Sequence, residues 1–312
     1  MWETILSQAF IVGLLAAGIR VATPILLAAL GEIISEKAGV LNIGIEGMML
    51  IGAFAAFIGG YYSGSPWLGL VAGAIAGAAA ALVHAYLSVT LGTDQVVNGI
   101  AMNVFGWGLT SLLFSALFGV KANPPRIETL GLVNLGALSE IPILGPILLH
   151  QSPLVYIALA MALICSWILF RTDAGLALRA VGEKPAAADT AGINVFRVRY
   201  IAVLAGGSLA GLGGAFLAVG QLGIFSDNMT AGRGFIALAV VIFGRWSFAG
   251  TLFASFLFGL AYALQLSLQA LGFGVPYQFL LMLPYVLTIV ALVLAVDRRG
   301  APAALALPYE IE

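Results

Sequence analysis

Seven polar residues stand inside or beside stretches of the chain that are otherwise apolar. Five carry amides, one a carboxylate and one a guanidinium, and all can hydrogen-bond a small polar molecule. Each such bond contributes roughly 0.5–1.5 kcal/mol net, so a row of them would guide a polar solute along a passage without trapping it. The candidate passage residues are Arg20, Asn42, Glu46, Asn98, Asn103, Gln265 and Gln269.

The same residues have structural interpretations that stay open at this stage. An amide inside an apolar helix can simply bond a neighbouring helix, for roughly 1 kcal/mol. Arg20 can pack into a helix interface, or pair with Glu46 or with a solute hydroxyl. Glu46 lies in a turn between Gly44 and Gly47 and can instead be a carboxylate at a helix start, where the helix dipole favours it.

Other kinds of chemistry find little support. Aromatic side chains that could stack a nucleobase are also normal packing residues of apolar helices; they are Phe105, Trp107, Phe235 and Phe243. The isolated His84 and His150 suggest no metal site. Without a Walker motif, a nucleophile elbow or a metal-ligand cluster, we expect no enzyme activity, no metal and no cofactor in this chain.

The composition makes the lipid bilayer the solvent of this protein. Of 312 residues, 62% are hydrophobic and 9% are charged, against roughly 25% charged in an ordinary soluble domain. The 39 glycines suit helices that pack closely in a membrane. A net charge of −1 gives no reason to expect nucleic acid, and the single Cys165 excludes an intramolecular disulfide.

Apolar runs long enough to cross about 30 Å of hydrocarbon recur along the whole sequence. The expected fold class is all-α, a polytopic membrane bundle of about nine transmembrane helices in one domain covering 1–312. Two of the runs, 47–62 and 233–246, are short and could be tilted or partly re-entrant. The expected spans are 8–30, 47–62, 67–91, 97–119, 152–170, 200–221, 233–246, 249–271 and 276–296.

A polar island at 171–199 interrupts the apolar sequence. Its five basic residues, of 13 in the chain, are Arg171, Arg179, Lys184, Arg197 and Arg199. Since Lys and Arg concentrate in short cytoplasmic loops, we expect the island and the C-terminus in the cytoplasm and the N-terminus outside a bacterial plasma membrane. The basic Arg298 and Arg299 agree with this orientation.

Within the island, the stretches 175–181 and 185–191 can each form a short helix, broken at Gly182 and Gly192. Pro185 suits the first turn of the second helix. Two rigid helices could transmit the motion of a partner protein, which a loop could not. A merely solvated loop is the alternative.

Two stretches, 16–53 and 204–241, resemble one another at an offset of about 188 residues. The first would begin outside the membrane and the second inside, as in the inverted repeats of many transporters, although a shared Gly/Ala bias would also produce part of the match. On this interpretation, repeat 1 covers about 8–120 and repeat 2 about 200–296. A linking helix at 152–170 and the island lie between them.

Four segments carry a family resemblance, and they occur in order along the chain. They are GEIISEKAGVLNIGIEGMMLIGAF (31–54), TDQVVNGIAMNVF (93–105), GLALRAVGEKPAAADTAGINV (175–195) and NMTAGRGFIALAVVIFGRWS (228–247). Over nearly its whole length the chain resembles permease subunits of ABC importers in the ribose and branched-chain amino-acid permease family. The 41–47 run is most similar to the nucleoside-uptake branch, whose external lipoprotein belongs to the basic membrane protein family.

The resemblance implies a fold similar to that of the vitamin B12 importer permease, with inverted repeats but without the first of its ten helices. It also implies a second, often non-identical permease, two ATP-binding subunits that hydrolyse ATP, and an external substrate-binding lipoprotein. The island would contact the ATP-binding subunit. The expected docking residues are Arg179, Gly182, Glu183, Lys184 and Asp189.

Three functions therefore stand side by side. The first is the membrane subunit of an ATP-driven importer for nucleosides or similar small polar solutes. The second is the same kind of subunit for a simple sugar, because amides serve a sugar equally well. The third is an ion-coupled secondary transporter acting alone, a class that usually needs ion-coordinating groups at mid-membrane, where only Arg20 is clearly expected.

Overall fold

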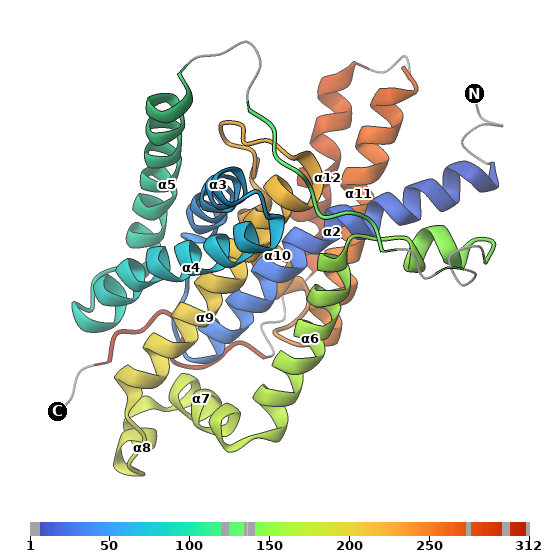
Figure 1. Cartoon of the computed structure of the whole chain (residues 1–312). Helices are drawn as coiled ribbons and strands as arrows, with labels where there is room; N and C mark the ends of the chain where they lie inside the picture. The colour runs from blue at the N-terminus through green and yellow to red at the C-terminus, as the bar shows by residue number, and fades with distance from the viewer. Residues whose placement is uncertain are drawn as a thin grey trace.

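The computed structural model describes residues 7–119, 125–133, 136, 141–272, 276–294 and 300–309, and these form helices without a strand (Figure 1). Arg298 and Arg299, on which part of the orientation argument rests, lie outside this set. In chain order the elements are α2 (Gln8–Lys37), α3 (Ile45–Ser63), α4 (Pro66–Ala85), η1 (Tyr86–Thr90), α5 (Gln95–Phe118), η3 (Gly145–Leu149), α6 (Pro153–Arg171), α7 (Asp173–Glu183), α8 (Pro185–Thr190), α9 (Val195–Ala215), η4 (Phe216–Leu222), α10 (Arg233–Phe243), α11 (Phe248–Ala270) and α12 (Tyr277–Leu294).

Seven helices of the described chain are long and apolar enough to cross a membrane, counting α4 with η1 and α9 with η4 as single spans. The run at 47–62 is one of them, as α3. By contrast, α10 has 11 residues, about 16 Å of helix, which is shorter than the roughly 30 Å of hydrocarbon in a bilayer. The total of nine crossings therefore stays a prediction.

The first span is longer than its apolar run indicates. We expected a connection after residue 30, but α2 continues to Lys37. The physical reason lies in the burial of its last two turns, where Glu32 and Glu36 are 1% and 2% exposed. Glu32 accepts the backbone N–H of Asn42 at 2.9 Å and Glu36 accepts the indole N–H of Trp246.

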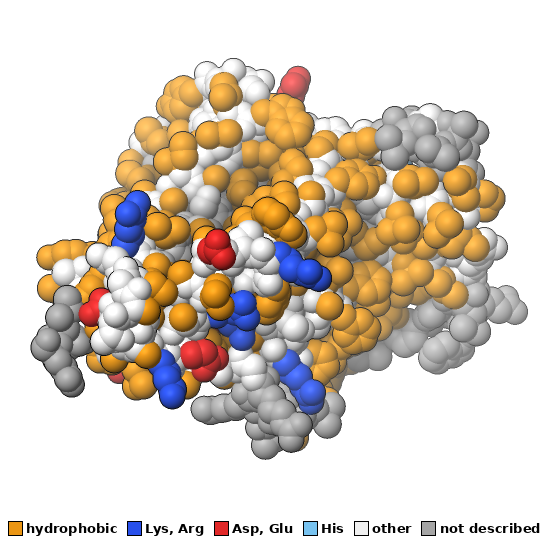
Figure 2. Space-filling model, turned by 90° about the horizontal axis from the view of Figure 1, so that it is seen from below, with side chains coloured by type: hydrophobic (Ala, Val, Ile, Leu, Met, Phe, Trp, Pro, Cys, Tyr) orange, Lys and Arg blue, Asp and Glu red, His pale blue; other side chains and the backbone are white. Residues whose placement is uncertain are grey.

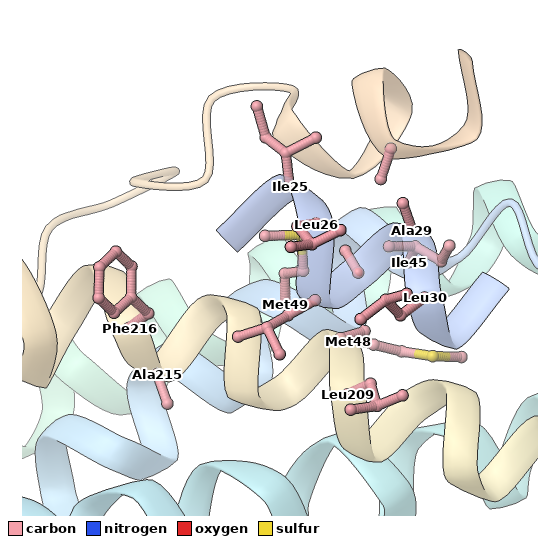
Figure 3. Close-up of a cluster of buried hydrophobic side chains, with 14 of the residues drawn as sticks. Ile25, Leu26, Ala29, Leu30, Ile45, Met48, Met49, Leu209, Ala215 and Phe216 are labelled. Carbon is pink, nitrogen blue, oxygen red and sulfur yellow. The ribbon is translucent and has the colours of Figure 1, made fainter. Parts of the chain in front are cut away.

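The centre of the bundle is an antiparallel pair, α2 and α9, with α3 packed along α9. Gly31 of α2 meets Gly206 of α9 so closely that a Cβ on Gly31 would lie 3.0 Å from the Cα of Gly206. Small residues permit this approach of two membrane helices. Around the crossing, apolar side chains of all three helices fill the interior, among them Leu30, Met49 and Leu209 (Figure 3).

Two further long helices cover this centre, one on each helix of the central pair. Helix α4 packs along α9, and α11 packs along α2. Gly77 of α4 and Gly259 of α11 make the close contacts, against the backbone of Gly207 and of Gly18 respectively. Helix α5 touches α3 and is otherwise largely exposed. The bundle therefore leaves one side of α5 open to lipid or to another protein.

The proline in the middle of α2 leaves a backbone carbonyl without its helical partner, and a side chain from η4, which continues α9, bonds that carbonyl. Pro24 has no N–H, so the carbonyl of Arg20, four residues earlier, loses its helical partner. The amide nitrogen of Gln221, in η4, donates to that carbonyl at 3.1 Å. Gln221 thus supplies the hydrogen bond that the proline removes.

Candidate functional site

The turn at 41–47 is rigid because its own polar groups bond one another. Asn42 is fully buried; its side-chain oxygen accepts the N–H of Gly44 at 3.1 Å. From α4, the ring of His84 bonds the carbonyl of Leu41 at 3.2 Å. Asn42 was expected to face a passage, and in this structure it lies inside the turn instead.

Asn103 fixes the same turn from α5. Its side-chain oxygen accepts the N–H of Gly47 at 2.8 Å, and its side-chain nitrogen donates to the carbonyl of Ile43 at 3.0 Å. The first of these bonds satisfies one of the free N–H groups at the start of α3. Asn103 therefore orders the start of α3 while remaining only half buried.

Glu46, in the first turn of α3, binds the beginning of α10. One carboxylate oxygen accepts from the hydroxyl of Thr230 at 2.6 Å and from the N–H of Gly232 at 2.8 Å. The other accepts from the N–H of Gly234 at 2.6 Å. The alternative pairing of Glu46 with Arg20 is wrong, because the start of α10 offers this carboxylate three donors and a favourable helix dipole.

A cavity of about 240 Å³ opens beside these groups. Two aromatic side chains border it, Trp107 of α5 and Phe235 of α10, which are 55% and 48% exposed. Its floor is formed by the starts of α3 and α10. The lining residues are Glu46, Gly47, Leu50, Asn103, Val104, Trp107, Asn228, Gly232 and Phe235.

Five of the seven candidate passage residues lie away from this cavity, and Asn42, inside its turn, is one of them. Asn98 donates to the hydroxyls of Ser88 at 3.1 Å and Thr93 at 2.8 Å. Arg20 and Gln269 are half buried. Gln265 is buried inside the bundle at 4% exposure. The structure thus brings together Glu46 and Asn103, and adds Asn228, which the sequence did not single out.

The polar island forms two short helices on one end of the molecule, as expected. Figure 2 views the structure from that end and shows Lys, Arg, Asp and Glu side chains gathered there. The exposed ones on α7 and its neighbours include Arg171, Glu183, Lys184 and Arg197. The expected helix break at Gly182 is wrong, since α7 runs on to Glu183.

Gly182 remains helical because it is pressed against the end of α2. A Cβ at this position would lie 2.9 Å from the carbonyl carbon of Lys37, so only glycine fits. Arg179 lies half buried with its guanidinium 5.3 Å from the ring centre of Phe170. Among the expected docking residues, only Glu183 and Lys184 are exposed. Arg199 is also no docking residue, since it is 1% exposed.

A C-terminal segment, residues 300–309, crosses this end of the molecule and was not anticipated as part of the site. The N–H of Ala304 donates to the carbonyl of Gly182 at 2.9 Å. The carbonyl of Leu307 accepts from Arg199 Nη1 at 3.0 Å. The hydroxyl of Tyr309 donates to Asp189 at 2.9 Å. The segment thereby ties α7, α8 and α9 together.

The sequence is similar to those of known transporter permeases. The guanosine ABC transporter permease protein NupQ of Bacillus subtilis is 41% identical over 92% of this chain and 93% of its own. The putative glucose ABC transporter permease protein TsgC13 of Haloferax volcanii is 40% identical over 85% and 80%. The nucleoside ABC transporter permease protein NupC of Lactococcus lactis is 39% identical over 91% and 92%.

No solved structure matches the chain, so the likeness to the vitamin B12 importer permease stays a prediction. Residues 14–292 match a single family, described as the permease component of the branched-chain amino acid transport system. The match covers the central helices, the cavity beside Glu46 and the α7–α8 end. The chain belongs to this family and is a multi-pass membrane permease subunit of an ABC importer.

Proposed function

We propose that this permease carries nucleosides or chemically similar small polar solutes through the cavity beside Glu46. The observation that carries the proposal is the meeting of two exposed aromatic rings, Trp107 and Phe235, with the amides of Asn103 and Asn228 around one opening. A nucleobase needs a ring on which to stack, and its ribose needs hydrogen-bond partners. The names of two relatives, a guanosine and a nucleoside permease, point the same way.

A simple sugar is the second candidate, because a relative of similar identity is named as a putative glucose permease. The amides would serve a sugar as well as a ribose. The aromatic rings favour the nucleoside, since stacking one base on an aromatic side chain contributes about 1–3 kcal/mol. Family membership disfavours the third candidate, an ion-coupled transporter acting alone.

The open side of the cavity supports a second permease as its other wall. Trp107 and Phe235 are about half exposed. The exposed side of α5 extends beyond Trp107 along the same helix. A complete passage would form when a second, non-identical permease covers this side. Two ATP-binding subunits would bind and hydrolyse ATP at the α7–α8 end, and an external lipoprotein would deliver the solute.

An inverted repeat would explain how the two halves meet. Helices α3 and α10 begin at Ile45 and Arg233, 188 positions apart, which is the offset of the two similar stretches. Under this repeat α2 corresponds to α9 and α4 to α11, in keeping with the reciprocal packing of α4 on α9 and α11 on α2. The pseudo-axis would pass through the contact between Glu46 and Gly234.

In the resulting mechanism, ATP binding closes the partner subunits and moves α7 and α8 with them. The motion passes into the bundle at Gly182, which is pressed against the end of α2. The two permeases then rock about their interface, and the cavity opens alternately to the two sides of the membrane. A weakly binding passage suffices, since the lipoprotein would select the solute.

The test is uptake of labelled guanosine and glucose by vesicles that contain the assembled importer. Trp107→Leu should lower guanosine uptake by about tenfold, the equivalent of the 1.4 kcal/mol within the range of one stacked base. The matched control is Phe105→Leu, an exposed aromatic of the same helix outside the cavity. If the importer takes up glucose rather than guanosine, and Trp107→Leu does not change that uptake, the solute is a sugar.

Orientation is tested separately with a reporter that works only in the cytoplasm. Fusion after Glu312 should give signal and fusion at Met1 should give none, because we place the α7–α8 end and the C-terminus in the cytoplasm of a bacterial plasma membrane. Equal signals at both ends would show that the number of crossings is even.

A further inference from the structure

A second cavity, of about 510 Å³, lies between α2, η3, α6 and α11, away from the solute cavity. Its walls are almost wholly apolar. Side chains such as Leu26, Val155 and Phe256 line it. At its edge, Leu159 of α6 and Phe253 of α11 are 39% and 63% exposed. The cavity therefore opens sideways, toward the surroundings of a membrane span rather than toward either aqueous side.

Two residues that line this cavity each carry a buried polar side-chain atom without a hydrogen-bond partner among the described residues. These atoms are the side-chain oxygen of Gln151 and the hydroxyl of Ser255, on residues 0% and 1% exposed. The amide nitrogen of Gln151 is already engaged, since it donates to the carbonyl of Ile147 at 2.8 Å. A buried acceptor left unpaired is destabilising, so this oxygen is available to accept a hydrogen bond from another molecule.

The two atoms lie at different depths. Gln151 immediately precedes α6, and its amide contacts the carbonyl of Ala16 in the N-terminal half of α2. Ser255 lies seven residues into α11, which begins near the other face of the membrane; seven residues of helix rise about 10 Å. The cavity thus extends from one membrane face, at Gln151, into the hydrocarbon interior.

We propose that this cavity binds one membrane phospholipid, with an acyl chain between α2, α6 and α11 and a head-group donor on the side-chain oxygen of Gln151. A volume of this size falls in the range of small-molecule sites, and apolar walls would keep water out. The sideways opening admits a lipid from the bilayer. The unpaired acceptor selects a head group that carries N–H or O–H.

This assignment does not depend on which solute the importer carries. It does suggest how lipid would affect the transporter, because α6 leads directly from the cavity to α7 through Arg171 and Thr172. A lipid wedged beside α6 would fix the position of the helix that precedes the docking end.

The experiment uses the full-length chain, assembled with its partner subunits, in vesicles that contain a phospholipid with a photoreactive group at mid-chain. Two probes differ only in the head group: phosphatidylethanolamine, whose ammonium donates hydrogen bonds, and phosphatidylcholine, whose trimethylammonium does not. We expect the first to label cavity residues such as Leu26 and Phe256 several-fold more than the second, because only the first can donate a hydrogen bond to Gln151.

Filling the cavity provides the second arm. Leu159→Trp should reduce cavity labelling by roughly tenfold, because the larger side chain takes up space that the acyl chain would occupy. Leu163→Trp is the matched control, one turn later on the same helix, outside the cavity and 73% exposed; it should change nothing. Ser255→Phe fills the interior end and should act like Leu159→Trp. Equal labelling by both probes, or labelling that survives both filling substitutions, would overturn the proposal.

Discussion

The carboxylate of Glu46, in the first turn of α3, accepts the backbone N–H of Gly234, in the first turn of α10, at 2.6 Å. The two residues are 188 positions apart, so the starts of two helices from the two halves of the chain share one anion. A Cβ on Gly234 would lie 2.6 Å from the Cα of Glu46. The contact between α3 and α10 beside the solute cavity therefore depends on the charge of Glu46 and on the absence of a side chain at Gly234.

Removing the charge of Glu46 should weaken this contact and destabilise the fold without abolishing it. In Glu46→Gln, the side-chain oxygen can still accept hydrogen bonds from Thr230 and Gly232. The NH₂ group that replaces the other oxygen cannot accept from the N–H of Gly234. Hydrogen bonds to charged groups contribute about 1.5–3 kcal/mol, so the purified complex should melt at a lower temperature. Thermal unfolding followed by tryptophan fluorescence measures this.

Gly234→Ala is the companion variant, because it keeps the charge and blocks the approach. It should destabilise more than Glu46→Gln, since the added Cβ meets backbone, which cannot move aside. If Gly234→Ala melts like the unchanged protein, the close contact between α3 and α10 is wrong.

The pairing of Pro24 with Gln221 predicts a non-additive result. Gln221→Leu removes the donor to the Arg20 carbonyl and should cost about 1–3 kcal/mol, the penalty of a buried unpaired acceptor. In a Pro24→Ala background, residue 24 regains an N–H for that carbonyl. Gln221→Leu should then cost little.

A double-mutant cycle on these two positions, measured by thermal unfolding of the assembled complex, gives the coupling directly. A coupling energy near zero would mean that Gln221 stabilises the bundle by packing alone.

The helices of this bundle were accessible to sequence reasoning because each apolar run needs only its own residues to indicate a span. The runs at 97–119 and 152–170 match α5 and α6 within two residues. The end of α2 was missed for a physical reason. Glu32 and Glu36 are charged in sequence, and their burial depends on Asn42 and on the distant Trp246.

The candidate site was accessible only in part. Glu46 and Asn103 could be selected by residue type, because polar groups in apolar runs require partners. Their actual partners could not be derived, since Gly234 and Gly47 offer only backbone N–H groups, which every residue except proline has. The contribution of residues 300–309 carries no signal in the sequence, since this short, mostly apolar stretch bonds largely through its backbone.

The proposed docking of the ATP-binding subunit at the α7–α8 end predicts a charge effect at Lys184. This side chain is exposed between α7 and α8, so Lys184→Glu should leave the fold intact and weaken assembly with the ATP-binding subunit. Juxtaposed like charges cost several kcal/mol, and co-purification of the two subunits should fall sharply, most strongly at low salt. Solute uptake should fall with it.

Arg197→Glu is the matched control, an exposed basic residue of the same island on α9. It should retain assembly and uptake. If both variants assemble normally, docking does not involve Lys184. Substitution of Gly182 would be uninformative here, because its contact with the end of α2 makes any side chain disruptive to the fold.

The C-terminal segment leads to the last prediction. Ending the chain at residue 299 removes the carbonyl of Leu307 from the guanidinium of Arg199, which is 1% exposed, and an unpaired buried charged group costs at least about 1–3 kcal/mol. The truncated protein should therefore expose α7 and α8 to limited proteolysis. Tyr309→Phe isolates one contact: it loses the bond to Asp189 but keeps the ring 5.9 Å from that of Phe196. This variant should show only a slight increase in cleavage. If truncation leaves the cleavage rate of α7–α8 unchanged, the segment contacts these helices without stabilising them.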